Sequence, residues 1–436
     1  MSKLRRIVVK SIVYGFAVIA LFASAKVVLA QDAAQTIIPN EIIVKLNQAS
    51  DLAAIAAQYN LSATPIDQFG SVPIYRLRVL NNGDVSQIVQ QMRSDSARVA
   101  YADPNYIIGA PGSSSVPWSL GGSWSIGGSW SIGGSAKGFA KQWMGTRINL
   151  PAAQAVSKGR GVKVAVLDTG IDMSHPLFAG KLLAGRDFVD NDNDPSEVGT
   201  PNSGAFGHGT HVAGIVLMVA PDAKIIPIRV LDQNGVGNIW TLSKALNYAA
   251  NPDGNPATDD GANIINLSLG TIQRTNLVTN LLNAVGTSPS HPNRFGDFPN
   301  IEEPNIVVTA AAGNTGDSTK IYPAAETVRG LLAVGASTNN DTLASFSTRG
   351  LWVQIIAPGE RIISAVPGGR YGVWRGTSMS APIVAGVAAL IKAKYPTLDS
   401  DEIIFRIRGG SVPLPNMMMR RIDAARCLQT VTPQFP

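Results

Sequence analysis

The sequence has very little cysteine and no concentrated block of positive charge beyond its first residues. Cys427 is the single cysteine, so an internal disulfide is excluded, and stability must come from core packing, with metal binding as a further source. Because Cys427 lies far along the chain from the motifs described below, we interpret it as structural. The net charge of +6 includes several N-terminal cations, and no Lys/Arg patch of the nucleic-acid-binding kind follows, so we expect no nucleic-acid partner.

The N-terminus has the features of an export signal. Cations at positions 3, 5, 6 and 10 precede an apolar run over residues 11–25, and Val28-Leu29-Ala30 fits a signal-peptidase site after Ala30. The run is short for a membrane span, which needs about 20 apolar residues, and Lys26 interrupts it. We therefore expect residues 1–30 to be a signal peptide, and the protein to be secreted and to meet the membrane only during export. An uncleaved anchor is the alternative.

Residues 31–109 are expected to form a small α+β domain. Residues 41–46 and 74–79 have strand patterns, residues 52–59 and 85–92 have helical spacing, and residues 99–107 close the unit as a strand. The order strand, helix, strand, helix, strand suits a compact two-layer domain.

The segment 110–141 differs from its neighbours in composition. A hexapeptide beginning with tryptophan occurs three times, at Trp118, Trp124 and Trp130, and each copy contains Gly-Gly-Ser. Gly/Ser content is typical of a flexible linker, whereas an even period would place the three rings on one face of a docking strand. Both interpretations stay open.

Residues 142–436 are expected to form one α/β domain. Apolar, β-branched runs at 162–167, 225–231, 264–267 and 306–309 alternate with helical segments and predict a largely parallel sheet flanked by helices. In such a sheet, the chemistry lies at the carboxyl ends of the strands. Two polar, proline-containing stretches, 251–261 and 286–304, are predicted to be surface loops.

Three short segments carry residues suited to nucleophilic catalysis. Asp168 directly follows an apolar strand, His208 lies between two glycines where a helix begins, and Ser378 sits at a Gly-Thr turn before an Ala/Val/Leu-rich helix. Acyl transfer needs a hydroxyl nucleophile, a base that titrates near neutrality, and a carboxylate that orients the base. The chain order Asp, His, Ser is one of the known orders of this triad. Taken singly, each residue is more typical of a helix cap or a structural site, and His211 is the expected structural histidine.

These segments resemble signatures of the subtilisin (subtilase) family of serine peptidases. The matching segments are Asp-Thr-Gly-Ile-Asp from Asp168, His-Gly-Thr-His-Val-Ala-Gly from His208, and Gly-Thr-Ser-Met-Ser-Ala-Pro around Ser378. The resemblance covers about residue 142 to the C-terminal region and implies a subtilisin-like fold and endopeptidase activity that requires no cofactor for its chemistry. It also implies that Asp168 orients the base, His208 is the base and Ser378 is the nucleophile.

The resemblance extends to the oxyanion and substrate sites. Residues 309–314 resemble the family's oxyanion motif, which implies that Asn314 and the Ser378 N–H bind the oxyanion. Ser268, Leu269 and Gly270 resemble the substrate-binding strand, and Gly235, Val236 and Gly237 resemble its facing edge; a protein or peptide substrate would add between them. Ile321 stands where relatives often carry Gly or Asn at the base of the primary pocket, so we expect a shallow apolar pocket that favours small or medium P1 residues.

The N-terminal domain resembles the subtilisin propeptide in two segments, 39–45 and 99–106. This resemblance implies a folding chaperone and an intramolecular inhibitor whose tail lies in the active site until self-cleavage. The cut is expected between Ile108 and Ser135.

An oxygen-rich segment, 187–194, resembles a calcium loop of the family. Asp187, Asp192 and Asp194 are the candidate ligands, because carboxylate oxygens suit Ca²⁺. A solvated acidic loop without metal is the alternative.

Two rival functions are compatible with a triad of these residue types. A lipase or esterase has a Gly-x-Ser-x-Gly elbow and the order Ser, Asp, His, whereas here Ser380 replaces the last glycine and Ser378 comes last. A catalytically silent binding protein with the same fold is the other, and the presence of all four catalytic residue types argues against it.

Overall fold

The computed structural model describes residues 36–110, 134–255, 257–287, 298, 301, 304–415 and 417–429. The predicted signal peptide, its cleavage site and the three tryptophan repeats lie outside these ranges. No helix in the ranges described is long and apolar enough to cross a membrane.

The N-terminal domain has the predicted order of elements. It comprises β1 (Ile37–Leu46), α2 (Leu52–Gln58), β2 (Asp67–Gln68), β3 (Ile74–Arg78), α3 (Val85–Arg93) and β4 (Val99–Gly109), with a 3-10 turn at Ala49–Asp51. The strands lie in the order β2-β3-β1-β4, and β1 is antiparallel to both neighbours. α3 begins where the Asp84 carboxylate accepts hydrogen bonds from two first-turn N–H groups, because a cap satisfies donors that the helix leaves unpaired.

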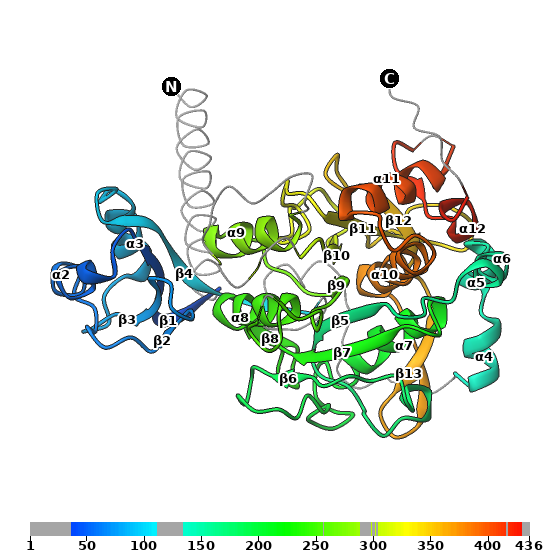
Figure 1. The fold of residues 1–436 in the computed structure, drawn as a ribbon, viewed down its shortest axis with the longest axis horizontal. Helices are drawn as coiled ribbons and strands as arrows, with labels where there is room; N and C mark the ends of the chain where they lie inside the picture. The colour runs from blue at the N-terminus through cyan, green and yellow to red at the C-terminus, as the bar shows by residue number, and fades with distance from the viewer. Residues whose placement is uncertain are drawn as a thin grey trace, which may run out of the picture.

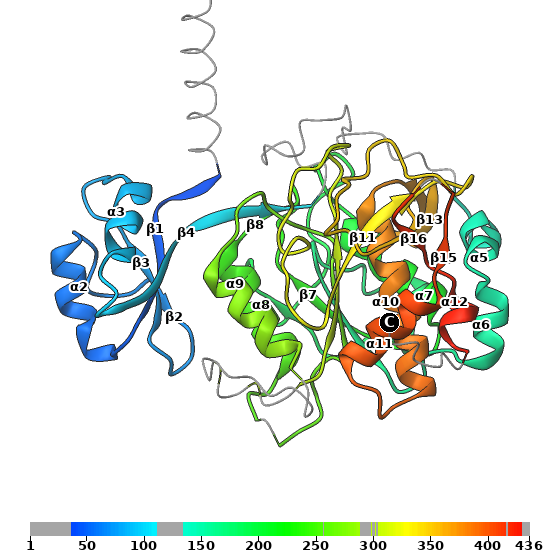
Figure 2. The same ribbon diagram turned by 90° about the horizontal axis from the view of Figure 1, so that it is seen from above.

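Both faces of this small sheet are buried. Because side chains alternate along a strand, neighbouring residues point to opposite faces and pack in different cores. Ile42 and Val44 pack with α2 and α3 in the domain's own core, whereas Ile43, between them, packs with the second domain. In the same way Leu77 faces inward and Ile74 outward. Figures 1 and 2 show the blue N-terminal domain beside the green helices α8 (Ile239–Ala250) and α9 (Asn276–Val285).

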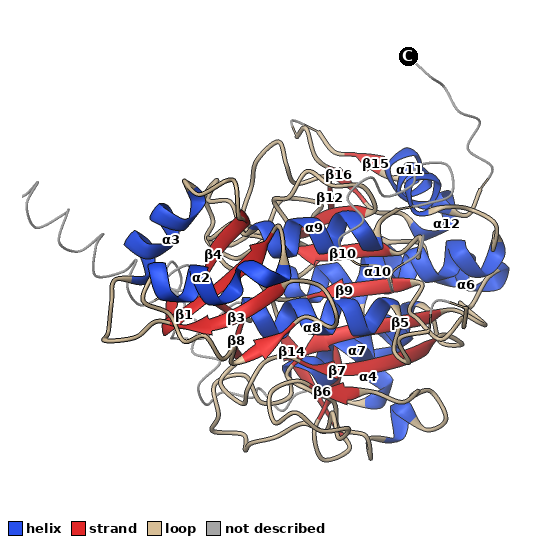
Figure 3. Cartoon of the chain, turned by 60° about the vertical axis from the view of Figure 1, so that its left-hand side comes forward, coloured by secondary structure: helices blue, strands red, loops and turns tan. Residues whose placement is uncertain are grey.

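The second domain is built on a large, almost entirely parallel sheet, as predicted (Figure 3). Among the described residues nine strands follow the order β15-β16-β12-β11-β10-β9-β5-β7-β6, and only the β15–β16 pair is antiparallel. Their bounds are β5 (Lys163–Asp168), β6 (Arg186–Asp187), β7 (Lys224–Arg229), β9 (Ile264–Leu267), β10 (Val307–Ala311), β11 (Leu331–Ser337), β12 (Ile355–Pro358), β15 (Val412–Pro413) and β16 (Arg420–Arg421).

Helices cover both faces of this sheet. Val164 and Val166 of β5 pack with α7 (His208–Val219) and α10 (Thr377–Lys394), while the alternate residues Ala165 and Leu167 pack with α8 and α9. Alternate residues of each apolar strand therefore pack into the cores on opposite faces of the sheet. This is why the strand segments are apolar at nearly every position. The remaining elements are β8 (Val236–Asn238), the hairpin β13 (Ile362–Val366) and β14 (Arg370–Trp374), and helices α4 (Ala136–Lys141), α5 (Trp143–Arg147), α6 (Leu150–Val156), α11 (Ser400–Gly410) and α12 (Ala424–Cys427), with a 3-10 turn at Pro176–Phe178.

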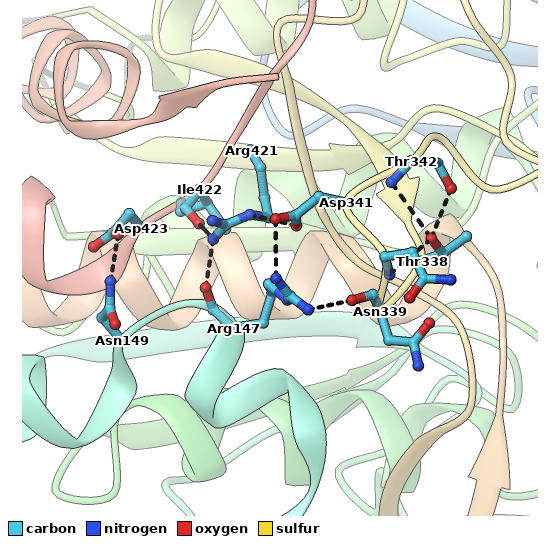
Figure 4. A network of polar contacts seen from close by, with 10 residues as sticks. Arg147, Asn149, Thr338, Asn339, Asp341, Thr342, Arg421, Ile422 and Asp423 are labelled. Carbon is cyan, nitrogen blue, oxygen red and sulfur yellow. Dashed lines mark hydrogen bonds and ion pairs between the residues drawn. The ribbon is translucent and has the colours of Figure 1, made fainter. Parts of the chain in front are cut away.

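The two ends of the second domain are joined by polar contacts (Figure 4). The Asp341 carboxylate pairs with Arg147 Nη1 at 3.1 Å and with Arg421 Nε at 2.8 Å. Asn149 Nδ2 donates to the Asp423 carboxylate at 2.6 Å, and each of these residues lies two positions after an arginine of the network. Segments 274 residues apart in the sequence are thus held together near the β16 end of the sheet.

Cys427 has the structural role that we expected. Its thiol is fully buried in the core formed with α10 and α11, and burial raises the pKa of Cys427 to about 12. α4 packs on β13 through Phe139, within the segment that the sequence patterns assigned to the linker.

Candidate active site

The Asp168 and His208 side chains are brought together by a strand end and a helix start. Asp168 is the last residue of β5, and His208 is the first residue of α7. The Asp168 carboxylate contacts His208 Nδ1 at 2.7 Å, and its Oδ1 also accepts the Thr169 backbone N–H at 2.8 Å. Both side chains are almost completely buried, so the carboxylate is held in a fixed position with little competing water.

Ser378 is the second residue of α10, and the helix follows directly after Gly376. Its hydroxyl donates to the Ser268 carbonyl oxygen at 3.4 Å, longer than the roughly 2.7 Å of a well-formed O–H···O bond. The Ser268 hydroxyl in turn donates to the Ser378 carbonyl oxygen at 2.9 Å. The nucleophile candidate is therefore packed against the predicted substrate strand, and α7 and α10 pack against each other beneath it.

The Asn314 side chain is oriented by the residue before the serine. Its Oδ1 accepts hydrogen bonds from the Thr377 N–H at 2.9 Å and from the Thr377 hydroxyl at 3.0 Å. This leaves the Nδ2 donor turned toward Gly376, where an added Cβ would lie 3.1 Å away. Gly376 has a φ of +150°, which few other residues adopt, so glycine is needed here both for the turn and for the close approach. An amide donor and the start of a helix thus face the same point beside Ser378.

The end of β4 fills a groove formed by the two predicted substrate-binding segments. Ile107, Ile108 and Gly109 pair antiparallel with Asn238, Gly237 and Val236. On the other side Gly109 and Gly270 exchange two hydrogen bonds, at 3.0 and 2.9 Å, and the Ala110 N–H donates to the Gly235 carbonyl oxygen at 2.9 Å. Figure 2 shows β4 leaving the blue domain and running to β8. The N-terminal domain therefore occupies the groove as an added strand.

Ile321, predicted to stand at the base of the primary pocket, lies beside Gly270 and Gly313. It is fully buried, and its side chain stands so close to Gly270 and Gly313 that a Cβ on either would lie 2.5 to 2.6 Å from it. Leu269, next to Gly270, is buried in the core on the α8 and α9 side. The volume between the two glycines is thus taken by an aliphatic side chain.

Three residues that the sequence analysis did not single out complete the surroundings. Trp374 stacks against His208, with ring centroids 5.6 Å apart, and against His211, at 4.9 Å. Burial and the neighbouring His208 lower the pKa of His211 to about 3, so this histidine is neutral and structural, as predicted. The second residue is Thr377, which holds Asn314. The third is Glu197, which contacts Thr210 and Thr169. Thr377 stands inside a quoted motif, whereas no local pattern marks Glu197.

The three predicted calcium ligands form ion pairs or hydrogen bonds within the protein, and calcium binding at this loop stays a prediction. The Asp187 carboxylate forms a buried ion pair with Arg229, and its Oδ1 accepts the N–H groups of Val189 and Asp190. Asp192 and Asp194 accept local backbone N–H groups within their own turns. Across the part of the chain that the structure describes, no three carboxylate, histidine or cysteine side chains converge as a metal-binding group. A guanidinium supplies the positive charge that Asp187 needs.

The fold and these side chains are those of an α/β serine peptidase, preceded by a smaller domain whose last strand lies between β8 and Gly270. Residues 159–410 match the subtilase family, and the chain belongs to that family. Residues 23–105 match the fervidolysin N-terminal prodomain, so we call the first domain the prodomain and the second the peptidase domain.

Named relatives agree with this assignment. The chain is 35% identical over 330 residues to the thermophilic serine proteinase of Bacillus sp. (strain AK1), covering 73% of this chain and 69% of that protein. It is 37% identical over 265 residues to thermitase of Thermoactinomyces vulgaris, covering 58% of this chain and 83% of thermitase.

A solved structure shares the two-domain arrangement. Fervidolysin from Fervidobacterium pennivorans, described as a keratinolytic enzyme related to subtilisin, superposes with a TM-score of 0.68 at 22% identity. The match covers 92% of this chain and 62% of fervidolysin, so this chain spans less than two thirds of that protein. At this identity the likeness concerns the fold.

Proposed function

We propose that the protein is a secreted serine endopeptidase that is made as a self-inhibited, self-processing zymogen. In this proposal Asp168 orients His208, His208 removes the proton from Ser378, and the serine oxygen attacks the peptide carbonyl to give an acyl-enzyme. The 2.7 Å Asp168–His208 contact in a buried setting supports these roles. The hydrogen bond between the Ser378 hydroxyl and the imidazole would form when substrate is bound, since catalytic hydrogen bonds often tighten only then.

The oxyanion of the tetrahedral intermediate would be bound by Asn314 Nδ2 and the Ser378 N–H. Thr377 supports this role, because its two hydrogen bonds hold the amide oxygen of Asn314 and so determine where the amide nitrogen points. Pre-oriented donors stabilise developing charge without reorganisation during the reaction.

The observation that carries the proposal is the strand Ile107–Ala110 in the groove. Its backbone pairs on both sides, with β8 and with Gly270, as an extended substrate would. A substrate of this kind is recognised through its backbone, which suits a protein or peptide of varied sequence. We propose that the prodomain inhibits by this occupancy and is cleaved after Ile108 and before Ser135.

The chain would be divided as a signal peptide at 1–30, a prodomain at 31–109, a linker that begins at residue 110, and a peptidase domain to which α4 contributes. Export is supported by the charged and apolar pattern of the first 30 residues. The buried Ile321 supports a preference for small or medium P1 side chains, because little volume remains between Gly270 and Gly313.

Expression of the precursor beside its Ser378→Ala variant tests the proposal. Intact mass and casein hydrolysis are measured for both proteins. The wild type is expected to lose its first hundred or so residues, which reflects the position of the repeats after Ile108, and to digest casein, while the variant stays whole and inactive. Equal behaviour of the two proteins would contradict Ser378 as the nucleophile. The new N-terminus locates the cut.

A further inference from the structure

The loop between β6 and α7 runs back beside the end of β5. The Ile171 N–H donates to the Pro195 carbonyl oxygen, and the Glu197 N–H donates to the Ile171 carbonyl oxygen, both at 3.0 Å. Ile171 lies three residues after Asp168, the last residue of β5. Glu197 as a whole residue is half-buried, but its carboxyl group is turned inward and buried. The loop thus places a carboxyl group beside the two segments that carry Asp168 and His208.

Two threonine hydroxyls link these segments to each other. Thr169 directly follows β5, and its hydroxyl accepts the Gly209 N–H of α7 at 2.9 Å. Thr210 belongs to α7, and its hydroxyl accepts the Asp172 N–H, on the β5 side, at 2.9 Å. Each segment therefore donates a backbone N–H to a hydroxyl of the other, so the end of β5 and the start of α7 are linked in both directions.

One carboxyl group takes the hydrogens of both hydroxyls. The Thr210 hydroxyl donates to Glu197 Oε2 at 2.8 Å, and the Thr169 hydroxyl also contacts this carboxyl group. A hydroxyl has one hydrogen to donate, and an ionised carboxylate accepts hydrogen bonds without donating any. With its hydrogen directed at Glu197, each hydroxyl presents its lone pairs to the backbone N–H of the opposite segment. A protonated carboxyl or an amide would place a donor of its own among these hydroxyls and weaken the arrangement.

The two linked segments are in direct contact beside the catalytic pair. A Cβ added to Gly209 would lie 2.1 Å from the Gly170 carbonyl oxygen and 3.1 Å from the Asp168 Cβ. The Asp168–His208 contact of 2.7 Å bridges the same two segments. Any shift of the start of α7 against the end of β5 therefore moves the imidazole relative to the carboxylate. A misplacement on the order of 1 Å can lower a rate by about 10²-fold.

We infer that Glu197 is a positioning residue for the reaction, which acts through Thr169 and Thr210 on the contact between the catalytic carboxylate and imidazole. The active form is the ionised carboxylate, because only this form accepts from both hydroxyls without donating. Glu197 itself touches neither the substrate nor the reacting atoms. The inference rests on the proposed catalytic roles of Asp168 and His208.

The charge state of Glu197 changes in the neutral pH range. Burial raises the pKa of Glu197 to about 7 against the hydrogen bonds that it accepts, and the Asp168 charge adds to the rise. Burial also lowers the pKa of His211 to about 3, so His211 stays neutral. The titratable groups on the segments packed against the carboxyl are Asp168, Asp172, His208 and His211. The carboxylate is thus present above about pH 7 and is lost below it.

Glu197→Gln tests the inference, with Val198→Ala as the matched control. Val198 is the next residue of the same loop, and it is 39% exposed. Each full-length precursor is expressed and allowed to process, and its active sites are counted by titration with a fluorophosphonate that reacts with a nucleophilic serine. The values of kcat and KM per active site are then measured on one peptide substrate from about pH 6 to about pH 9.

Above about pH 8, Glu197→Gln is expected to lower kcat by roughly 10- to 100-fold with KM nearly unchanged, because the lost contacts act on the catalytic pair and not on the substrate. The ratio of wild-type to Gln-variant kcat should shrink as the pH falls through 7, since the wild-type carboxyl is then protonated as well. Val198→Ala should keep the wild-type kcat at every pH. A residue that only stabilised the fold would reduce the number of active sites and leave kcat per site unchanged.

Equal kcat per active site in Glu197→Gln and Val198→Ala, or a ratio that does not change with pH, would overturn the inference. If Glu197→Gln yields no folded enzyme, Thr210→Val takes its place, because it removes the hydroxyl and keeps the side-chain shape. The same fall in kcat is expected, and an unchanged kcat would overturn the inference. A wild-type enzyme as inactive as Ser378→Ala would contradict the proposed function together with this inference. An active wild type that is insensitive to Glu197 would contradict this inference alone.

Discussion

Glu197 accepts a hydrogen bond from the Thr210 hydroxyl at 2.8 Å, behind the pair formed by Asp168 and His208. Thr210 lies in the first turn of α7, two residues after His208, and the Thr169 hydroxyl beside Asp168 also contacts the Glu197 carboxylate. The same Thr169 hydroxyl accepts the Gly209 N–H at 2.9 Å. Glu197 thus connects the residues that flank both members of the pair. Burial, opposed by these hydrogen bonds, raises the pKa of Glu197 to about 7, and the Asp168 charge adds to the rise.

This raised pKa predicts a pH-dependent stability term. Below about pH 4.5 the carboxyl is protonated in both states; as pH rises toward 7 the unfolded chain loses its proton first, so the folded state loses stability through that window. We expect Glu197→Gln, in the Ser378→Ala background, to remove about 1–3 kcal/mol of the fall in unfolding free energy between pH 4.5 and 8. Urea unfolding at both pH values measures this. Parallel pH curves for the two proteins would show that Glu197 ionises normally.

Thr377 is expected to act on catalysis through Asn314. Asn314→Ala should lower kcat by roughly 10²–10³ with little change in KM, the magnitude known for such a donor in a subtilisin. Thr377→Val keeps the backbone donor but removes the hydroxyl that holds Asn314 Oδ1, so kcat should fall by a smaller factor. Thr377→Ser retains the hydroxyl and is the control. Steady-state kinetics on one peptide series compare the kcat values of the three variants. If Thr377→Val is as active as Thr377→Ser, the Thr377 hydroxyl does not orient Asn314.

The shallow-pocket prediction concerns Ile321. Ile321→Gly opens the space beside Gly270 and Gly313, so kcat/KM for a P1 Phe peptide should rise by about tenfold or more relative to the matched P1 Ala peptide. The wild-type enzyme should favour Ala. Activity on the Ala peptide serves as the control for folding. If the wild type already cleaves after Phe as readily as after Ala, Ile321 does not limit the pocket.

The Asp341 network is expected to contribute strongly to stability. Asp341→Asn leaves the Arg421 guanidinium, whose side chain is only 8% exposed, without its carboxylate, and should lower the unfolding free energy by about 2–4 kcal/mol. Asp401→Asn breaks the Arg329–Asp401 surface pair, in which the arginine side chain is 53% exposed. This change should lower the unfolding free energy by less than about 1 kcal/mol. Denaturant unfolding of both variants with Ser378→Ala compares them. Similar losses would mean that Arg421 is well solvated after the substitution.

Short sequence patterns were sufficient to predict many of the helices and strands of this protein and its candidate catalytic residues. The prodomain elements follow the predicted strand and helix segments within a few residues, because alternation in β1 and β3 and helical spacing in α2 and α3 are properties of short windows. The peptidase strands β5, β7, β9 and β10 were likewise predicted from apolar runs, and Asp168, His208 and Ser378 from contiguous segments. The ion-pair partner of Asp187, a candidate calcium ligand, could not be predicted, because Arg229 lies 42 residues later and no local window contains both residues.

The sequence by itself determined the family, the order of domains, the parallel sheet and the candidate catalytic residues, since each is written in a short segment or a simple period. Tertiary structure alone decided how the long-range partners meet. It placed Phe69 against Trp240, Glu197 behind Asp168, Thr377 on Asn314 and Ile107–Ala110 in the groove. The physical reason is that packing and buried hydrogen bonds form between residues that are close in space. A local sequence pattern does not show which distant side chain will pair with a buried charge or fill a pocket.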